Sequence, residues 1–175
     1  MNVTKQIPEI AALIEGSNYI DIKTIEGQTS LRQFVASMLS YYPWWIVLLY
    51  RIRAFLVKIL GLVEHQAPEV LPHLQAEDVS FVVGDAVTFF IVRLAKEEQY
   101  WLAETPEDKH LSAFLGIVVE PIAENSKRFH VATIVRYKHW TGPVYFNLIR
   151  PFHHLVVSQM MRAGVAANPS NISET

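Results

Sequence analysis

The spacing of hydrophobic residues along the chain changes at Val79 and again at Gly142. Before Val79, most apolar residues recur every three or four positions, which is the period of an α-helix. Between Val79 and Trp140 they alternate with polar residues, which is the period of a β-strand. After Gly142 the helical period returns and continues to about Arg162. The pattern predicts helices first, then a run of strands, and finally one long helix.

The first 60 residues are predicted to contain three helices and one early strand. The first helix covers 8–14, and the alternating segment Tyr19 to Ile25 is a strand that ends at Gly27. Ser30 and Gln33 have the spacing of a capping box, which marks the start of the second helix. Pro43 suits the first turn of the third helix, which continues to Leu60. Its apolar face is expected to pack in the core and consists of Trp45, Leu48, Leu49, Ile52, Leu56 and Ile59.

Five successive strands are predicted after the change of period. They are Val79–Val83, Ala86–Ala95, Gln99–Glu104, Leu111–Glu120 and Phe129–Trp140. Short connections between consecutive strands indicate an antiparallel meander. One face of the last strand is expected to point inward and carries Phe129, Val131, Thr133, Val135, Tyr137 and His139.

The closing helix, from Val144 to Arg162, is expected to lie across this sheet. Pro151 lacks a backbone N–H and should bend the helix near its middle. The side predicted to be buried consists of Val144, Tyr145, Leu148, Ile149, Phe152, Leu155, Val156 and Gln159. An antiparallel sheet with helices grouped on one face belongs to the α+β class. We expect one domain over 1–175, with an N-terminal extension over 1–17 and a flexible tail over 166–175.

Composition narrows the class of protein. Hydrophobic residues make up 51% of the 175 and charged residues 18%, which excludes a disordered chain and indicates a large core or a lined cavity. The formal net charge of -2 gives no electrostatic reason to expect nucleic acid as a partner. Without cysteine, the chain has no disulfide, no thiolate metal site and no thiol nucleophile. The first 16 residues do not resemble a secretory signal, so we expect a cytoplasmic protein.

The segment Tyr42 to Val63 could suggest contact with a membrane. Its longest uninterrupted apolar run, Pro43 to Tyr50, is far shorter than the roughly 20 residues that a spanning helix needs. Arg51, Arg53 and Lys58 near its middle also disfavour insertion. We therefore expect no transmembrane span. Aromatic residues with dispersed cations also suit a membrane surface, so surface binding stays open beside the alternative of core packing.

Several local motifs resemble those of a known superfamily. They are Pro43-Trp44-Trp45, Leu49-Tyr50-Arg51-Ile52-Arg53, Gly61-Leu62, Asp108-Lys109-His110-Leu111, and Tyr145 with Pro151-Phe152-His153. With the order of elements, they resemble the helix-grip superfamily of START-like lipid-transfer domains and polyketide cyclases, in an uncharacterised bacterial branch. The resemblance covers about 18–164 and implies a curved sheet around a long C-terminal helix, with a small-molecule cavity between them. Some members of that branch follow an NAD(P)-binding Rossmann domain, but this chain lacks the glycine-rich fingerprint, so we expect no cofactor.

Candidate chemistry centres on polar residues that should face the cavity. The candidate ligand-binding residues are Thr133, Tyr137, His139, Tyr145, Arg51 and His110. Inward polar groups must find partners in the protein or contact a ligand. No metal site is expected: His153 and His154 point about 100° apart on a helix, and Asp108 with His110 has no evident third ligand. Catalytic residues cannot be assigned.

Three functions remain open. The first is binding of a small apolar or amphipathic molecule in the cavity. The second is a cyclase-like or dehydratase-like enzyme, in which His139 or His110 acts with Tyr137 in general acid–base catalysis. The third is a regulatory or interaction domain that works with an NAD(P)-dependent reductase.

Overall fold

The computed structural model describes residues 7–59, 73–106 and 110–166 of the chain. The described helices are α1 (Pro8–Glu15), α2 (Leu31–Leu39), α3 (Trp44–Ile59) and α4 (Thr141–Ala166), with the short 3-10 helix η2 (Ala76–Asp78). The described strands are β1 (Tyr19–Gly27), β2 (Ala86–Val87), β3 (Phe90–Lys96), β4 (Tyr100–Glu104), β5 (Leu111–Ala123) and β6 (Ser126–Tyr137).

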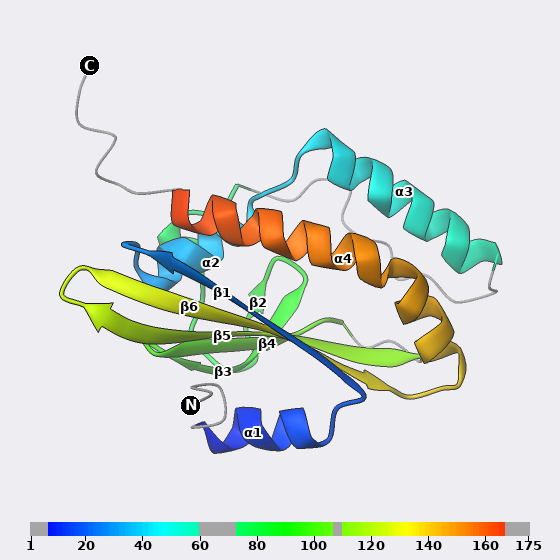
Figure 1. Cartoon of the computed structure of the whole chain (residues 1–175), viewed down its shortest axis with the longest axis horizontal. Helices are drawn as coiled ribbons and strands as arrows, with labels where there is room; N and C mark the ends of the chain where they lie inside the picture. The colour runs from blue at the N-terminus through cyan, green and yellow to red at the C-terminus, as the bar shows by residue number, and fades with distance from the viewer. Residues whose placement is uncertain (1–6, 60–72, 107–109, 167–175) are drawn as a thin grey trace.

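These strands form one six-stranded antiparallel sheet in the order β1-β6-β5-β4-β3-β2. The first strand therefore completes the sheet beside the last one. Figure 1 shows α4 crossing one face of the curved sheet, with α2 beside it and α3 beyond it, while α1 lies against the opposite face. This is the α+β helix-grip arrangement. We call the face toward α2 and α4 the inner face, and the face toward α1 the outer face.

Both faces of the central strands are buried, each in its own hydrophobic cluster. The inner cluster joins Phe34 of α2 and Val157 of α4 to Phe129 and Val131 of β6. The outer cluster joins Ile10 of α1 to Ala132 and Ile134 of β6. The segment predicted to be an N-terminal extension thus contributes a helix that covers the outer face. The Arg136 guanidinium donates to the carbonyl oxygens of Ala12 and Leu13 near the C-terminus of α1, where a cation is favourable.

Three predicted strands differ from the observed ones. The segment 79–83 is not a strand, because Val79 ends η2 and the following residues form a loop. The segment 86–95 is two strands, β2 and β3, since the chain turns at Thr88 with a φ of 57°. The last strand ends at Tyr137 rather than Trp140, and α4 starts only four residues later, at Thr141.

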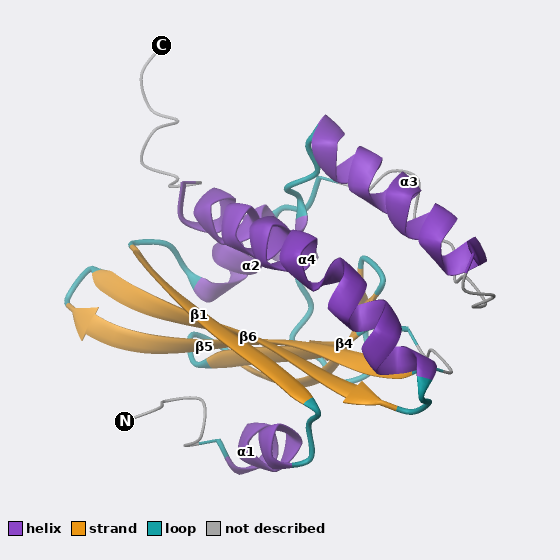
Figure 2. Cartoon of the chain, turned by 45° about the vertical axis from the view of Figure 1, so that its right-hand side comes forward, coloured by secondary structure: helices purple, strands orange, loops and turns teal. Residues whose placement is uncertain are grey.

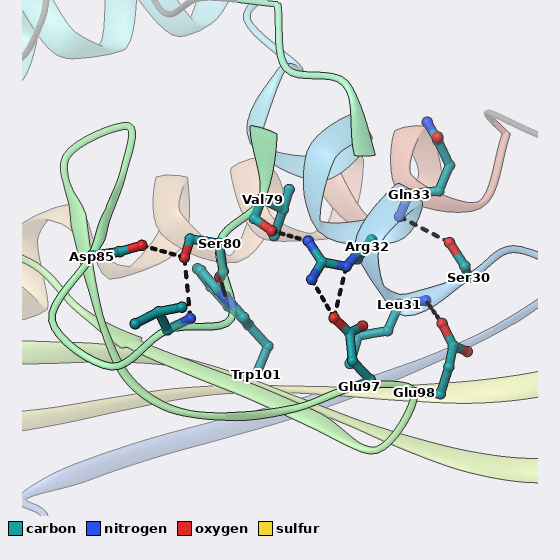
Figure 3. A network of polar contacts seen from close by, with 11 residues as sticks. Ser30, Leu31, Arg32, Gln33, Val79, Ser80, Asp85, Glu97, Glu98 and Trp101 are labelled. Carbon is teal, nitrogen blue, oxygen red and sulfur yellow. Dashed lines mark hydrogen bonds and ion pairs between the residues drawn. The ribbon is translucent and has the colours of Figure 1, made fainter. Parts of the chain in front are cut away.

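The start of α2 is fixed by side chains from distant parts of the chain (Figure 3). Ser30 caps the helix by accepting a hydrogen bond of 3.1 Å from the Gln33 backbone N–H, although the Gln33 side chain bonds Ser37 instead of completing the predicted capping box. The carboxylate of Glu98 accepts from the backbone N–H of Leu31 at 3.0 Å. Arg32 binds Glu97 and the carbonyl oxygen of Val79. These bonds hold the β3–β4 turn against the helix.

The buried side of α4 differs from the predicted one. Tyr145 is buried as expected, but the predicted core residues Val144, Leu148, Phe152 and Leu155 are exposed, with Phe152 at 44%. The residues that are buried are Gly142, Tyr145, Phe146, Val157, Met161 and Gly164. Figure 2 shows the axis of α4 changing direction part-way along, as expected for a helix with Pro151 in its interior. In α3, Leu48 and Ile52 are also exposed, contrary to the predicted core face.

Candidate functional site

A polar cluster lies between β1 and α4, on the inner face of the sheet. Alternation along β1 places Tyr19, Asp21 and Lys23 on this face. Each is partly buried, and α4 brings His153 and His154 against them. We call these five residues the β1–α4 cluster. It joins the edge strand of the sheet to the middle of α4.

His154 links the hydroxyl of Tyr19 to the carboxylate of Asp21. Its Nε2 lies 3.0 Å from the Tyr19 hydroxyl, and its Nδ1 lies 3.1 Å from Asp21 Oδ2. Burial, followed by the nearby Asp21 charge, raises the pKa of Tyr19 above its usual value of 10, so this hydroxyl stays protonated and can donate. When Tyr19 donates to Nε2, the proton of a neutral His154 ring is on Nδ1, facing Asp21.

Two buried polar atoms in this cluster have no hydrogen-bond partner among the described residues. They are Oδ2 of Asp21 and Nδ1 of His153. Asp21 Oδ2 is close to His154 Nδ1 and lies 3.3 Å from Lys23 Nζ, but neither contact has the geometry of a hydrogen bond. A buried polar atom without a partner costs about 1–3 kcal/mol. The cluster therefore holds two buried polar atoms without a hydrogen bond to the described residues, and of these two atoms only Asp21 Oδ2 has charge contacts to offset this.

Burial also sets the charge of His153. Burial, with a smaller contribution from the neighbouring His154 and an opposing one from Asp21, lowers the pKa of His153 from 6.5 to about 4. His153 is therefore neutral at neutral pH. Its imidazole can then donate or accept a hydrogen bond without introducing a charge under α4.

Aromatic side chains surround the cluster. The ring of Phe146, on α4, lies 4.7 Å from that of Tyr19 and 6.2 Å from that of Tyr137. Arg150 lies over the Tyr19 ring at 5.8 Å from its centroid. The site thus combines a polar centre with an apolar rim and one exposed cation.

Three of the predicted site residues lie near this cluster or on the same buried surfaces. Thr133 is 5% exposed on β6 and pairs directly with Asp21 across the two strands. Tyr137 is partly buried at the end of β6, where its backbone N–H donates to the Asn18 side chain at 2.7 Å. Tyr145 is buried on α4, next to Phe146 in the sequence.

The other predicted residues lie elsewhere. His139 is exposed beyond the end of β6, so its predicted place on the inner strand face beside Tyr137 was wrong. His139 and His110 both contact the Thr141 hydroxyl, with their Nδ1 atoms at 3.0 Å and 2.8 Å from it, near the start of α4. Arg51 is exposed on α3. Asp108 lies outside the described residues, so its pairing with His110 is not described.

Sequence reasoning missed most of the β1–α4 cluster. The sequence indicates only that the adjacent histidines, His153 and His154, cannot bind one metal ion together. The available signal was in the first strand, where Tyr19, Asp21 and Lys23 repeat at two-residue spacing. Polar residues on the inner face of an edge strand indicate a site only when the element that packs against that face is known. The sequence did not show that α4 turns its histidines toward that strand.

A second polar cluster lies on the outer face and ties three strands together. Glu120 of β5 lies 2.9 Å from His130 Nε2 and 3.3 Å from Arg128 Nη1, and Arg128 also pairs with Glu26 of β1 at 2.7 Å. The hydrogen bond from His130, with the Arg128 charge, lowers the pKa of Glu120. Its members are paired with one another, as expected of cross-strand polar contacts that stabilise a sheet.

The described parts of the chain contain neither a metal-binding group nor a membrane-spanning helix. Within them, no three histidine, aspartate or glutamate side chains are grouped in a way that could hold a metal ion. None of the described helices is both long enough and apolar enough to cross a membrane.

The fold and the cluster together define a helix-grip domain with a polar site beneath its C-terminal helix. The chain belongs to the family described as protein of unknown function (DUF2867), which matches residues 13–160. No curated protein matches the chain.

Two solved structures have a similar arrangement of elements. A START superfamily protein from Mycobacterium smegmatis is 13% identical, with a TM-score of 0.41, over 84% of this chain and 97% of that one. Norcoclaurine synthase from Thalictrum flavum, in complex with dopamine and hydroxybenzaldehyde, is 12% identical, with a TM-score of 0.42, over 94% of each chain. The helix-grip arrangement of this chain rests on its own sheet order and on the position of α4.

Proposed function

We propose that this protein binds a small amphipathic molecule between α4 and the inner face of the sheet. The observation that carries the proposal is that the β1–α4 cluster contains two buried polar atoms without a hydrogen bond to the described residues, Asp21 Oδ2 and His153 Nδ1. A ligand whose polar end reaches both atoms would supply the missing hydrogen bonds. Its apolar body would lie against aromatic side chains such as Phe146.

The chemistry of the β1–α4 cluster indicates which functional group the polar end of the ligand carries. An ionised Asp21 only accepts hydrogen bonds, so a hydroxyl or amine that donates to it is favoured. A carboxylate in the same position would be repelled by Asp21 and would leave Oδ2 without a donor. We therefore expect alcohols and amines to bind better than carboxylic acids of the same chain length.

Calorimetric titration with dodecanol, dodecylamine and dodecanoate tests this preference. We expect the alcohol and the amine to bind and the carboxylate to bind at least tenfold more weakly. Asp21→Asn should weaken dodecylamine binding by roughly 10- to 100-fold, because a hydrogen bond to a charged group contributes about 1.5–3 kcal/mol. Glu26→Gln, on the same strand but pairing on the outer face, is the matched control and should leave affinity unchanged.

Two results would contradict the proposal. One is no binding of any of the three probes, together with native mass spectra of the purified protein that contain no bound small molecule. The other is equal loss of affinity in Asp21→Asn and Glu26→Gln. If binding survives in Asp21→Asn but is lost in Thr133→Val or Tyr137→Phe, the proposal of a ligand site holds, and Thr133 or Tyr137 binds the polar end of the ligand in place of Asp21.

A second candidate function is proton transfer to or from the bound molecule. The position of His154, between the Asp21 carboxylate and the Tyr19 hydroxyl, favours it, because this arrangement orients an imidazole to exchange a proton at Nε2. His154 and Tyr19 replace the predicted pair of a histidine and Tyr137 in this role. Conversion of the molecule identified by native mass spectrometry should be lost in His154→Gln while its binding is kept. Unchanged conversion in that variant would exclude the role.

Association with an NAD(P)-dependent reductase, which the resemblance to fused relatives implies, stays a prediction. Co-expression with such a reductase and measurement of complex formation by analytical ultracentrifugation would test it.

A further inference from the structure

Helices α3 and α4 expose apolar side chains at helical spacing. On α3 these are Trp44, which is 78% exposed, followed by Leu48 and Ile52 at intervals of four. On α4 they are Val144, Leu148, Phe152 and Leu155, each between 44% and 52% exposed. Trp140, just before α4, is 73% exposed. Each helix therefore carries an apolar stripe that the described core does not cover.

Helices α3 and α4, which carry these stripes, lie on the same side of the sheet. Figures 1 and 2 show α3 and α4 on the side of the sheet opposite α1, and the two helices contact each other. We call the exposed residues of α3 and α4, together with Trp140, the α3–α4 face. Single exposed apolar residues are ordinary on proteins, but contiguous apolar surface marks a site of interaction.

The charge of these two helices differs sharply from that of the rest of the chain. α3 and α4 contain five arginines and lysines and no aspartate or glutamate. The remaining residues contain ten basic and 17 acidic residues, so they carry a formal charge of -7 against +5 on the two helices. Arg51 and Arg162 are exposed, and their positions follow the apolar stripes at helical spacing, three residues after Leu48 and seven after Leu155.

We propose that the α3–α4 face docks on the surface of a membrane that contains anionic lipids. Apolar stripes flanked by arginine, with tryptophan at their ends, fit the interfacial region of a bilayer. Anionic headgroups would pair with exposed cations of the two helices such as Arg51 and Arg162. A second copy of this chain is a poorer occupant, because a symmetric contact would bring two cationic faces together.

Co-sedimentation with vesicles tests the proposal. The full chain should bind vesicles of phosphatidylcholine and phosphatidylglycerol in equal parts, and should bind pure phosphatidylcholine at least fivefold more weakly. Raising the salt concentration to about 0.5 M should release the protein, because exposed charges are then screened within a few ångströms. Arg51→Glu should weaken binding roughly fivefold or more, since each cation near an anionic surface contributes about 1 kcal/mol.

Matched variants separate docking from loss of folding or of net charge. Lys96→Glu makes the same change in net charge as Arg51→Glu, but at an exposed position on β3, and should leave vesicle binding unchanged. The double variant Leu48→Ser, Leu148→Ser should lose binding while keeping its circular dichroism spectrum and melting temperature. Ile122→Ser, an exposed apolar position on β5, is the control for this pair and should bind like the parent.

Several results would overturn the proposal. They include no binding to the anionic vesicles, or equal weakening by Arg51→Glu and Lys96→Glu. A concentration-dependent dimer in ultracentrifugation that Leu48→Ser dissociates, with no vesicle binding, would assign the face to a second copy instead. These readouts are independent of Asp21 and His153, so the small-molecule site can fail while membrane docking holds, and the reverse.

Discussion

His153 and His154 are adjacent on α4 but have different contacts. His154 meets Tyr19 and Asp21 through both ring nitrogens. His153 has a buried Nδ1 without a partner and a pKa lowered to about 4. A rotation of about 100° between successive helical residues accounts for the different partners. The same rotation that excludes a shared metal ion allows one residue to bridge and the other to remain available.

His153 should make the protein less stable in weak acid. Its pKa is about 4 in the folded protein and about 6.5 in the unfolded chain, so the unfolded chain takes up a proton first as the pH falls. Stability is therefore lost from about pH 6.5 downward, by on the order of 2 kcal/mol between pH 7.5 and pH 5. His153→Leu should remove this part of the loss, as measured by urea denaturation at both pH values. Asn147→Leu, on the same helix and without a titrating group, should retain it.

Phe152 should contribute little to stability, in contrast to the 3–5 kcal/mol that a buried aromatic would contribute. Because it is 44% exposed, Phe152→Ala should cost less than about 1 kcal/mol in chemical denaturation. Phe129→Ala is the comparison, since Phe129 is fully buried and its ring stacks on that of Phe34 at 4.2 Å. That variant should lose about 3–5 kcal/mol. Similar losses in both variants would mean that the outer side of α4 is covered in solution.

At the scale of elements, the sequence predicted more about order than about orientation. The period of the apolar residues correctly gave α1, β1, α2, the β3–β6 meander and the long helix α4. It could not identify which apolar side of α4 is buried. Val144, Leu148 and Phe152 recur at helical spacing, and so do the residues that are in fact buried, such as Phe146, Val157 and Met161. It also could not reveal the β1–α4 cluster, which depends on a long-range contact. The burial of Thr133 and Tyr145 was predictable, because their own neighbours in the sequence indicate buried positions.

Gly164 fixes how closely α4 approaches α2. A Cβ atom at this position would lie 2.7 Å from ring atoms of Phe34 and 3.2 Å from the backbone oxygen of Phe34. Gly164→Ala should therefore destabilise by about 1–3 kcal/mol through overpacking, although alanine favours a helix by about 1 kcal/mol over glycine. Thermal denaturation measures the loss. Asn147→Ala, at an exposed position of the same helix, should instead leave stability unchanged or slightly raised, and a stabilised Gly164→Ala variant would show that the α2–α4 contact adjusts without strain.

At the scale of the whole molecule, the sheet separates two sides with different properties. The inner side carries α2, α3 and α4, the candidate ligand site and the cationic, apolar α3–α4 face. The outer side carries α1 and the paired charges around Glu120. This division places both proposed activities on one side, so a molecule bound beneath α4 would lie next to the docking face. The outer side is left to stabilise the sheet.

The stabilising role of the outer side can be measured through Ile10. This residue is fully buried in the outer cluster with Ala132 and Ile134, although the family match starts only at residue 13. Ile10→Ala should lower the free energy of unfolding by about 2–5 kcal/mol, because it removes buried methyl and methylene groups and leaves a cavity between α1 and the sheet. Glu15→Ala, exposed on the same helix, should change it by no more than about 0.5 kcal/mol. Dodecylamine affinity should stay at the parent value in Ile10→Ala under folding conditions, because the β1–α4 cluster lies on the other face of the sheet. If Ile10→Ala loses no more stability than Glu15→Ala, then packing of α1 contributes little to stability, and the sheet is stable with its outer face uncovered.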